Sequence, residues 1–520
     1  MKNLIATAFI AMYLLPVFGQ YTFHKLVYLE FPMIRFTGVF PTDSCFYISG
    51  TFTDTISPLR TGTFLSKMDL QGELANISTI KHPDRLYFND FADLKVNNEG
   101  NLYTVGIVND TAGSVKGILY IYDLEGDTIS TFDFRSPLYP DENHIWAKEV
   151  LQKSNGNYVI ANNHWALNPN SNDDNDLTLL SVTSDFQTIF FKTFGTKIWD
   201  EYATSLILDD EGQIFGAKRS NEAEVFLNFN CRTLLIKTDS LGNQQWQWLS
   251  PEGVLQDGAH AMIKTPDGGL VVASGQGQEI GNNPNIHTLV WDALIFKLDA
   301  DRNVVWSTPF RGGLPTGQTK LTEMVEATDC NGYVASGIFL EYISDVEWYH
   351  TSWLVKVSPE GDSLWARRYT YFDGEFVAPE VYDMKATPDG GYVLVGLSRN
   401  VGLPAPAWIM KVDSFGCLIP GCQLDDTTAV SGSPEQTARL AIFPNPASDF
   451  LHFELRPASI TSTFTARILD ANGKTITEIP AVSAHTTYTL PLWHWPPGVY
   501  FLQLLHDGVP VRTERFVVGR

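Results

Sequence analysis

The chain has 520 residues, of which 44% are hydrophobic and 18% are charged, a composition that excludes a globally disordered protein. Its formal net charge is −23, from 36 basic and 59 acidic residues. Nucleic-acid binders usually carry a basic surface, so this charge argues against a nucleic-acid partner. Aromatic residues (12%), 40 glycines and 28 prolines favour many short strands joined by tight turns.

Residues 1–19 have the pattern of a signal peptide. Lys2 is followed by an apolar run from Leu4 to Leu15, and Val17-Phe18-Gly19 resembles a cleavage site. The run is too short to span a bilayer comfortably, and no later segment has 18 uninterrupted apolar residues. We therefore expect an exported chain with no transmembrane segment after cleavage.

A repeat organises residues 20–422. An apolar strand followed by an Asp-x-x-Gly turn, and often by a Trp, recurs at intervals of 54 to 60 residues. The Asp position of this turn falls at Asp69, Asp123, Thr183, Asp239, Asp299, Ser358 and Asp413. A second turn, best seen in the two Thr-Pro-Asp-Gly-Gly segments, interleaves with the first. Each repeat thus contains four strands, and the sequence predicts an all-β, seven-bladed β-propeller whose Trp residues pack between blades.

The two ends of the repeat region predict how the ring closes. The seventh repeat lacks its Trp strand, whereas residues 24–31 form a predicted strand without a blade, so we expect the two to pair. Cys417 and Cys422 bracket a turn-forming insert, and export permits a disulfide between them; two free thiols are the alternative. The other three cysteines show no metal-ligand spacing.

The repeat resembles the tryptophan-docking repeats of quinoprotein-like propellers. Asp239, Gly242 and Trp246 match the Asp, Gly and Trp of that pattern, although the spacing between Asp and Gly differs by one residue. The resemblance implies the architecture and not a cofactor, because no residue set for a quinone and calcium is recognisable.

Residues 423–439 are polar and lack aromatics, as expected of a linker. Residues 440–520 carry three motifs in order, which contain Pro444, Asn445 and Pro446, then Asp470, Gly473 and Lys474, then Gly498 and Tyr500. They resemble the type A sorting domain of the type IX secretion system. The resemblance implies recognition by that secretion machinery and delivery to the outer cell surface or the extracellular medium. Alternating strands and Asn-Gly, Pro-Gly and Asp-Gly turns independently predict a small Ig-like β-sandwich, and an ordinary accessory domain is the alternative.

Short catalytic motifs are absent: the chain has no HExxH, Walker, GxSxG or CxxC pattern, so the sequence identifies no catalytic residue, metal site or cofactor. Function is therefore expected in the longer loops opposite the two turns. The candidate binding residues there are His144, Trp146, His164, Trp165, Trp199, His260, Trp348 and His350. These aromatics can equally serve to cover the blade ends. The Asp/Asn stretch 172–176 offers oxygen ligands for Ca²⁺, with an ordinary solvated loop as the alternative.

Three functions stay open. The favoured one is a surface propeller that binds an extracellular glycan or protein. The alternatives are an enzyme that degrades polysaccharide or peptide, and a structural or adhesion component of the cell surface. Carboxylates and histidines clustered in the central channel would favour the enzyme.

Overall fold

The structure is a computed structural model. It describes residues 21–54, 60–89, 93–110, 114–137, 145–165, 175–196, 199–209, 211–220, 231–252, 254–280, 288–310, 319–344, 347–369, 371–372, 375–376, 379–398, 404–419, 421–422, 439–445, 447–448, 450–456, 464–470, 474–482, 487–506 and 509–519. The predicted signal peptide and nearly all of the predicted linker lie outside these residues. The chain divides into two compact units, Met1–Asp425 and Asp426–Arg520. No α-helix occurs in the described part, so none of it forms a helix able to cross a membrane.

The described residues of the first unit form seven antiparallel sheets of four or five strands, which we number 1 to 7 in chain order, and one short hairpin. Sheet 1 contains β2 (Met33–Pro41), β3 (Cys45–Thr53), β4 (Thr61–Asp69) and β5 (Leu74–Ile80), and sheet 2 contains β6 (Arg85–Phe88), β7 (Lys95–Val96), β8 (Leu102–Asp110), β9 (Val115–Tyr122) and β10 (Thr128–Phe134). Sheet 3 contains β11 (Ile145–Gln152), β12 (Tyr158–Trp165), β13 (Asn175–Val182) and β14 (Thr188–Phe194), and sheet 4 contains β15 (Asp200–Asp209), β16 (Gly212–Ser220), β17 (Arg232–Asp239) and β18 (Gln244–Leu249). Sheet 5 contains β19 (Ala261–Lys264), β20 (Leu270–Ile280), β21 (Thr288–Leu298) and β22 (Val304–Phe310), and sheet 6 contains β23 (Lys320–Glu326), β24 (Tyr333–Ser344), β25 (Glu347–Val357) and β26 (Ser363–Tyr369). Sheet 7 contains β29 (Pro379–Ala386), β30 (Tyr392–Ser398), β31 (Ala407–Val412) and β1 (Phe23–Val27), and the hairpin contains β27 (Tyr371–Phe372) and β28 (Glu375–Phe376).

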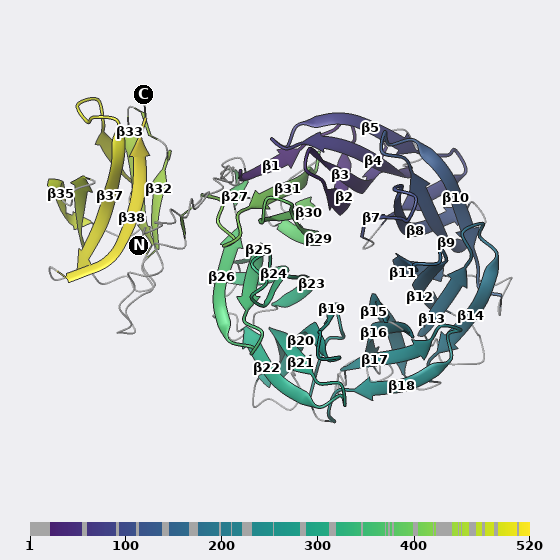
Figure 1. Ribbon diagram of the computed structural model, residues 1–520. Helices are drawn as coiled ribbons and strands as arrows, with labels where there is room; N and C mark the ends of the chain where they lie inside the picture. Colours follow the sequence, from purple (N-terminus) through teal and green to yellow (C-terminus); the bar gives the residue numbers. More distant parts are fainter. Residues whose placement is uncertain are drawn as a thin grey trace, which may run out of the picture. The chain divides into compact units, whose positions relative to one another are not determined.

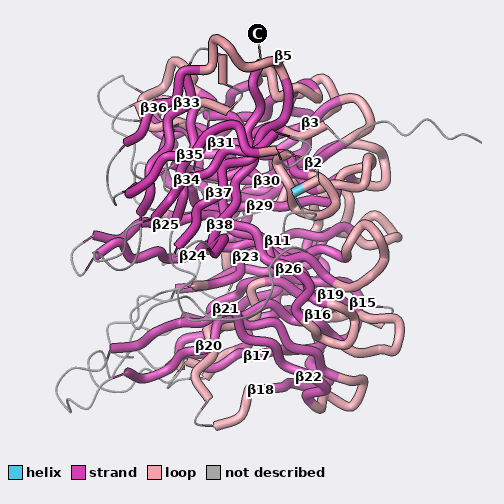
Figure 2. Tube along the Cα trace, turned by 90° about the vertical axis from the view of Figure 1, so that its left-hand side faces the viewer, coloured by secondary structure: helices cyan, strands magenta, loops and turns pink. Residues whose placement is uncertain are grey.

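These sheets stand around a ring, with the first strand of each sheet near the centre and the last at the rim (Figure 1). Each neighbouring pair of sheets shares one buried apolar cluster, such as Val271 and Ala335 between sheets 5 and 6. A single sheet cannot bury both of its faces, so stacking on two neighbours supplies the core. The tight turns within the sheets lie along one side of the ring (Figure 2).

The ring closes through its first strand. β1 pairs antiparallel with β31, from Phe23 opposite Lys411 to Val27 opposite Ala407, which confirms the predicted pairing. The strand ends at Val27 and does not extend to residue 31. Cys417 and Cys422, which follow β31, form a disulfide with 5.7 Å between their Cα atoms. The pairing removes the free edges that an open ring would expose.

Aromatic rings at the rim pack on glycines of the next sheet. The Trp306 indole of sheet 5 lies over Gly361 of sheet 6, where an added Cβ would come within 2.5 Å of the ring. Its Nε1–H donates to the Pro359 carbonyl at 3.1 Å. The pairs Trp365 and Gly416, Phe190 and Gly242, and Phe23 and Gly72 repeat this contact. Each of these glycines has a positive φ, which a tight turn requires and which glycine adopts without steric cost.

The described strands of the second unit form two sheets. The first contains β32 (Arg439–Phe443), β33 (Phe450–Arg456) and β36 (Thr487–Pro491), and the second contains β34 (Phe464–Asp470), β35 (Thr475–Val482), β37 (Gly498–His506) and β38 (Val509–Val518). Their inward-facing side chains, among them Phe453 and Leu502, share one core.

Three residues of the predicted sorting motifs stabilise this unit. The Asn445 side chain accepts from the Val517 N–H at 2.9 Å and donates to the Arg515 carbonyl at 3.2 Å. Tyr500 stacks on Phe516 of the same final strand, β38, with 5.7 Å between ring centroids. Asp470 Oδ1 accepts from the Lys474 N–H. Gly498 begins β37, and Pro444 is exposed after β32, whereas Pro446 and Gly473 lie outside the described residues.

Candidate functional site

The innermost strands of five sheets carry a bulge at one shared place, which includes the steps from Ala147 to Glu149 and from Val381 to Asp383. In sheet 2 the interruption is larger, because β6 ends at Phe88 and pairing resumes only at Lys95. A bulge bends a strand and re-aims its side chains. Four residues before the first turn of each sheet stand Gly38, Asp93, Glu149, Ser205, Ala261, Glu323 and Asp383. One repeat position thus supplies four carboxylates to the centre of the ring.

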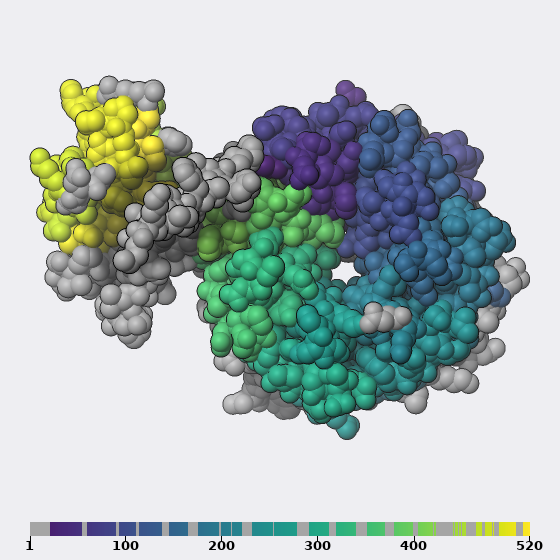
Figure 3. Space-filling model, viewed as in Figure 1, coloured from purple at the N-terminus to yellow at the C-terminus, as the bar shows by residue number. Residues whose placement is uncertain are grey.

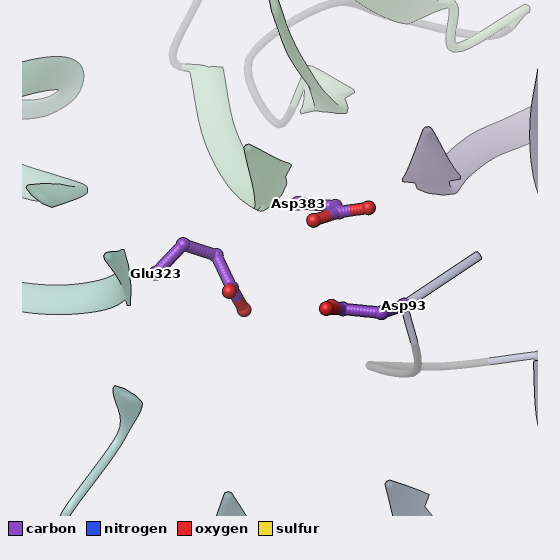
Figure 4. A group of neighbouring side chains, drawn as sticks. All are labelled: Asp93, Glu323 and Asp383. Carbon is purple, nitrogen blue, oxygen red and sulfur yellow. The ribbon is translucent and has the colours of Figure 1, made fainter. Parts of the chain in front are cut away.

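Three of these carboxylates meet. Oxygen atoms of Asp93, Glu323 and Asp383 all lie within 4.8 Å of one another, although the residues come from sheets 2, 6 and 7 (Figure 4). Asp383 is fully buried, and the other two side chains are partly exposed. In the space-filling view a narrow opening passes through the ring (Figure 3).

Two lysines neutralise part of this charge. The Lys385 ammonium group donates to Asp93 at 2.7 Å and also to Asp383. Lys95 lies 3.3 Å from Asp93 and pairs with Glu149. We call these two lysines and the four carboxylates the channel cluster.

Gly38 is the sheet 1 member of the same repeat position. A Cβ there would lie 2.8 Å from the Leu94 backbone nitrogen, so no side chain fits. Lys385 of sheet 7 therefore contacts Asp93 of sheet 2 with no sheet 1 side chain between them. The backbone of sheet 1 still takes part, because the Val39 N–H donates to Asp383 Oδ2 at 2.8 Å.

The environment separates the pKa values of the channel carboxylates. Burial, with the nearby Asp93, raises the pKa of Asp383 to about 6 and the pKa of Glu323 well above its usual range. Burial also raises the pKa of Glu149 to about 7. Burial acts on Asp93 in the same direction, but the ammonium groups of Lys385 and Lys95 outweigh it and hold that pKa below its usual range. The cluster thus places Glu323, whose pKa is raised, beside Asp93, whose pKa is lowered, and these coupled groups titrate together.

The three clustered carboxylates have the oxygen chemistry that Ca²⁺ or Mg²⁺ prefers. The ammonium group of Lys385 already contacts two of them, however, and would repel a divalent ion. The ammonium group of Lys385 therefore takes the place that a metal ion would occupy between these carboxylates. Of the Asp/Asn stretch, residues 172–174 lie outside the described residues, and the Asn175 N–H donates to Asp200 Oδ1 at 2.8 Å.

Four of the sequence-predicted binding residues have described side chains. Trp146 is 46% exposed and lies in β11, on the inner edge of sheet 3. Trp199 is half-buried immediately before β15, and His260 immediately precedes β19, where its Nε2 lies 3.3 Å from Asp257 Oδ2. His164 is in β12 and only 2% exposed, so its ring is not at the surface as a loop position would place it.

The other predicted residues cannot be placed against these. His144 lies outside the described residues, as do the side chains of Trp165, Trp348 and His350, whose backbones are in β12 and β25. Trp146 thus lies in the innermost strand of sheet 3 and His260 immediately before that of sheet 5, and Glu149 of the channel cluster stands three residues beyond Trp146.

Motif reasoning missed the channel cluster because its six members are distributed over four repeats, each with only one or two of them. The repeat register contains the missing signal. When the repeats are aligned on their first turn, the fourth residue before it reads Gly, Asp, Glu, Ser, Ala, Glu and Asp. Charged residues at an inward-facing position of a β repeat are unexpected in a structural core.

Comparison with protein families identifies the C-terminal unit. Residues 441–519 match the family described as "Secretion system C-terminal sorting domain". This is the sorting domain of the type IX secretion system, and it indicates export to the cell surface or the extracellular space.

No curated protein matches the chain. Solved structures with a similar arrangement include a protein of unknown function from Dyadobacter fermentans (11% identity, 75% of this chain and 97% of that chain, TM-score 0.39). An α-L-arabinanase from Penicillium chrysogenum in complex with arabinobiose is 12% identical over 76% of this chain and 98% of its own (TM-score 0.36). Drosophila Semaphorin 1a, extracellular domains 1–2, is 6% identical over 76% and 88% (TM-score 0.39). Likenesses this distant carry no argument about function.

Proposed function

We propose that this protein is an exported, seven-bladed β-propeller of the tryptophan-docked type that binds an extracellular glycan at the inner edge of its ring. The C-terminal unit is an Ig-like β-sandwich that directs the chain to the type IX secretion machinery. The ligand is held where Trp146 and His260 flank the channel.

The exposed Trp146 on an innermost strand carries this proposal. An indole costs free energy when it is left in water, and this one has 46% of its surface exposed beside a polar channel. The apolar face of a sugar ring packs on an indole, while the sugar hydroxyls can bond to lysine and carboxylate groups such as Lys95 and Glu149. A protein ligand would use the same aromatic and charged groups and is the alternative occupant.

A glycan array tests the proposal with the full chain without its signal peptide. We expect selective binding that Trp146→Ala weakens at least tenfold, because an aromatic platform is lost. Trp493→Ala is the matched control, since Trp493 is similarly exposed but lies in the other unit. Equal binding by wild type and Trp146→Ala, or binding to no glycan at all, contradicts the proposal.

The channel cluster favours a second function, hydrolysis of a polysaccharide. Glycoside hydrolases pair a protonated carboxylic acid with an ionised carboxylate, and the pKa of Glu323 is raised whereas that of Asp93 is lowered, with oxygens of the two groups within 4.8 Å of each other. Glu323 would then protonate the leaving oxygen, and Asp93 would act as base or nucleophile. Release of reducing ends from a polysaccharide panel, abolished by Glu323→Gln with glycan binding retained, would support this function. Binding without release of reducing ends would exclude it for that panel.

A further inference from the structure

The interface between sheets 4 and 5 departs from the aromatic-on-glycine packing of the rim by placing a charged residue at the turn. At the turn position where sheets 1, 2, 4, 6 and 7 have a glycine, sheet 3 has Phe186 and sheet 5 has Arg302. Its φ is +69°, a conformation that residues other than glycine rarely adopt. The turn itself is intact, since the Arg302 N–H donates to the Asp299 carbonyl at 2.9 Å. Arg302 therefore gives this turn a different surface from the glycine turns, while the backbone of the turn has the same hydrogen bond.

The change alters how the neighbouring aromatic residue packs. Trp246 of sheet 4 is the counterpart of Trp306, but it faces the Arg302 guanidinium group, 5.3 Å from the ring centroid, and not a bare glycine. A pocket of about 300 Å³ lies between sheets 4 and 5 at this place. Its lining includes Trp246, Ile214 and Leu270 as apolar walls. We call it the rim pocket.

The polar groups of the rim pocket define the ligand that it suits. Asp209 is nearly buried and already accepts from Lys237, at 2.5 Å, and from Lys264. The Asp299 carboxylate accepts from the Asn303 N–H at 2.8 Å within the turn. Arg302, by contrast, forms no ion pair among the residues that the structure describes. A guanidinium group offers five N–H donors in a planar fork that matches a carboxylate.

An aromatic wall, apolar neighbours and a guanidinium group that stacks on Trp246 without forming a described ion pair together fit a ring-shaped ligand that carries a carboxylate. The volume is at the small end of ligand pockets and suits one or two sugar units. A charge of −23 on the whole chain repels polyanions at long range, so the attraction must be local to Arg302. We propose that the rim pocket binds a uronic-acid unit of an acidic polysaccharide. The site lies on the turn side of the ring and does not depend on the proposed channel-mouth site.

Isothermal titration calorimetry of the full chain with tetragalacturonate tests this proposal. Wild-type protein is expected to bind, with affinity that falls as salt rises and with no binding of a neutral tetrasaccharide. Arg302→Gly introduces the glycine that five of the other six turns have and is expected to weaken binding at least tenfold while the protein stays folded. Arg302→Lys keeps the charge but loses the planar fork, and an intermediate loss of about threefold to fivefold is expected.

Trp146→Ala separates the two proposals, because it alters the channel mouth and is expected to leave tetragalacturonate binding unchanged. A loss of binding in Trp146→Ala together with full binding in Arg302→Gly would overturn the rim-pocket proposal and move the ligand to the channel. Failure of wild type to bind tetragalacturonate, or equal affinity for the neutral tetrasaccharide, would overturn it as well.

Discussion

The outer rim and the inner edge of the ring are built from the same repeat but follow different rules. At the rim, an aromatic ring packs on a turn glycine in four separate interfaces. At the inner edge, one repeat position is occupied by glycine, serine, alanine and four carboxylates. The contacts that recur hold the sheets together, whereas the position that varies places charge in the channel. Architecture is thus encoded by what the repeats share, and the candidate chemistry by where they differ.

The largest change in stability is expected for Lys385→Met, at the inner edge of the ring. The substitution leaves Asp93 and Asp383 without the ammonium group that both contact, and breaking a buried ion pair on one side costs about 3–5 kcal/mol. Urea unfolding followed by tryptophan fluorescence measures the loss. Lys81→Met is the matched control, because Lys81 pairs with Asp54 but is half exposed, and a change below about 1 kcal/mol is expected. Similar losses in both variants would show that the channel cluster is not a buried network.

Gly361→Ala probes the rim. The added methyl group meets the Trp306 ring at 2.5 Å, and the alanine must also adopt a φ of +93°. We expect a loss of about 3 kcal/mol from strain and overpacking together. Gly100→Ala carries the same type of strain, with a φ of +84° and no atom within 4 Å, so it should cost only about 1 kcal/mol. If the two variants unfold alike, the aromatic contact contributes nothing beyond turn geometry.

The pH dependence of stability distinguishes the inner edge from the rim. A carboxyl group with a raised pKa binds more protons in the folded state than in the unfolded state. Its contribution to stability therefore falls as the pH rises from the pKa of the unfolded state to the pKa of the folded state. For Glu149, at about 7, and Asp383, at about 6, that window runs from about pH 4 to pH 7. We expect the free energy of unfolding to drop by several kcal/mol across it, because each unit of raised pKa corresponds to about 1.4 kcal/mol.

Glu149→Gln should flatten this slope in thermal melts recorded from pH 5 to pH 8. Asp267→Asn is the control at an exposed turn, since Lys297 and Thr265 lower the pKa of Asp267 to about 2. That control lowers stability by a constant amount above pH 4, and its effect on the slope is confined to pH below 4, where falling pH removes the contribution of the ionised group. A slope that is identical in wild type and Glu149→Gln would rule out titration of this group as its cause.

The smallest expected effect is that of Trp306→Phe. Phenylalanine keeps a ring over Gly361 but loses the Nε1–H bond to the Pro359 carbonyl, which contributes about 1 kcal/mol. Equilibrium unfolding in urea resolves this difference, and Trp246→Phe, whose ring faces Arg302, serves as comparison. A loss as large as that of Gly361→Ala would mean that the hydrogen bond, and not the ring contact, dominates rim packing.

The repeat made the sheets and the closing strand predictable, because Asp-x-x-Gly turns and alternating strands are local signals. The sorting unit was recognisable for the same reason, through contiguous motifs around Asn445 and Tyr500. The channel cluster was not predicted, since Asp93 and Lys385 are 292 residues apart and meet only when the ring is closed. His164 was misjudged because a histidine next to a polar stretch reads as a loop residue, whereas its strand continues and buries it.

Closure by β1 also has a consequence for the order of folding. The strand that completes sheet 7 is made first, yet its partner, β31, is separated from it by about 380 residues of chain. Such high contact order makes the final pairing slow, because the entropy of closing the long loop is lost before the strand contacts form. A chain that is cut short anywhere before Val412 cannot complete this pairing and keeps two unpaired sheet edges. Only a chain that contains all seven sheets can therefore close the ring.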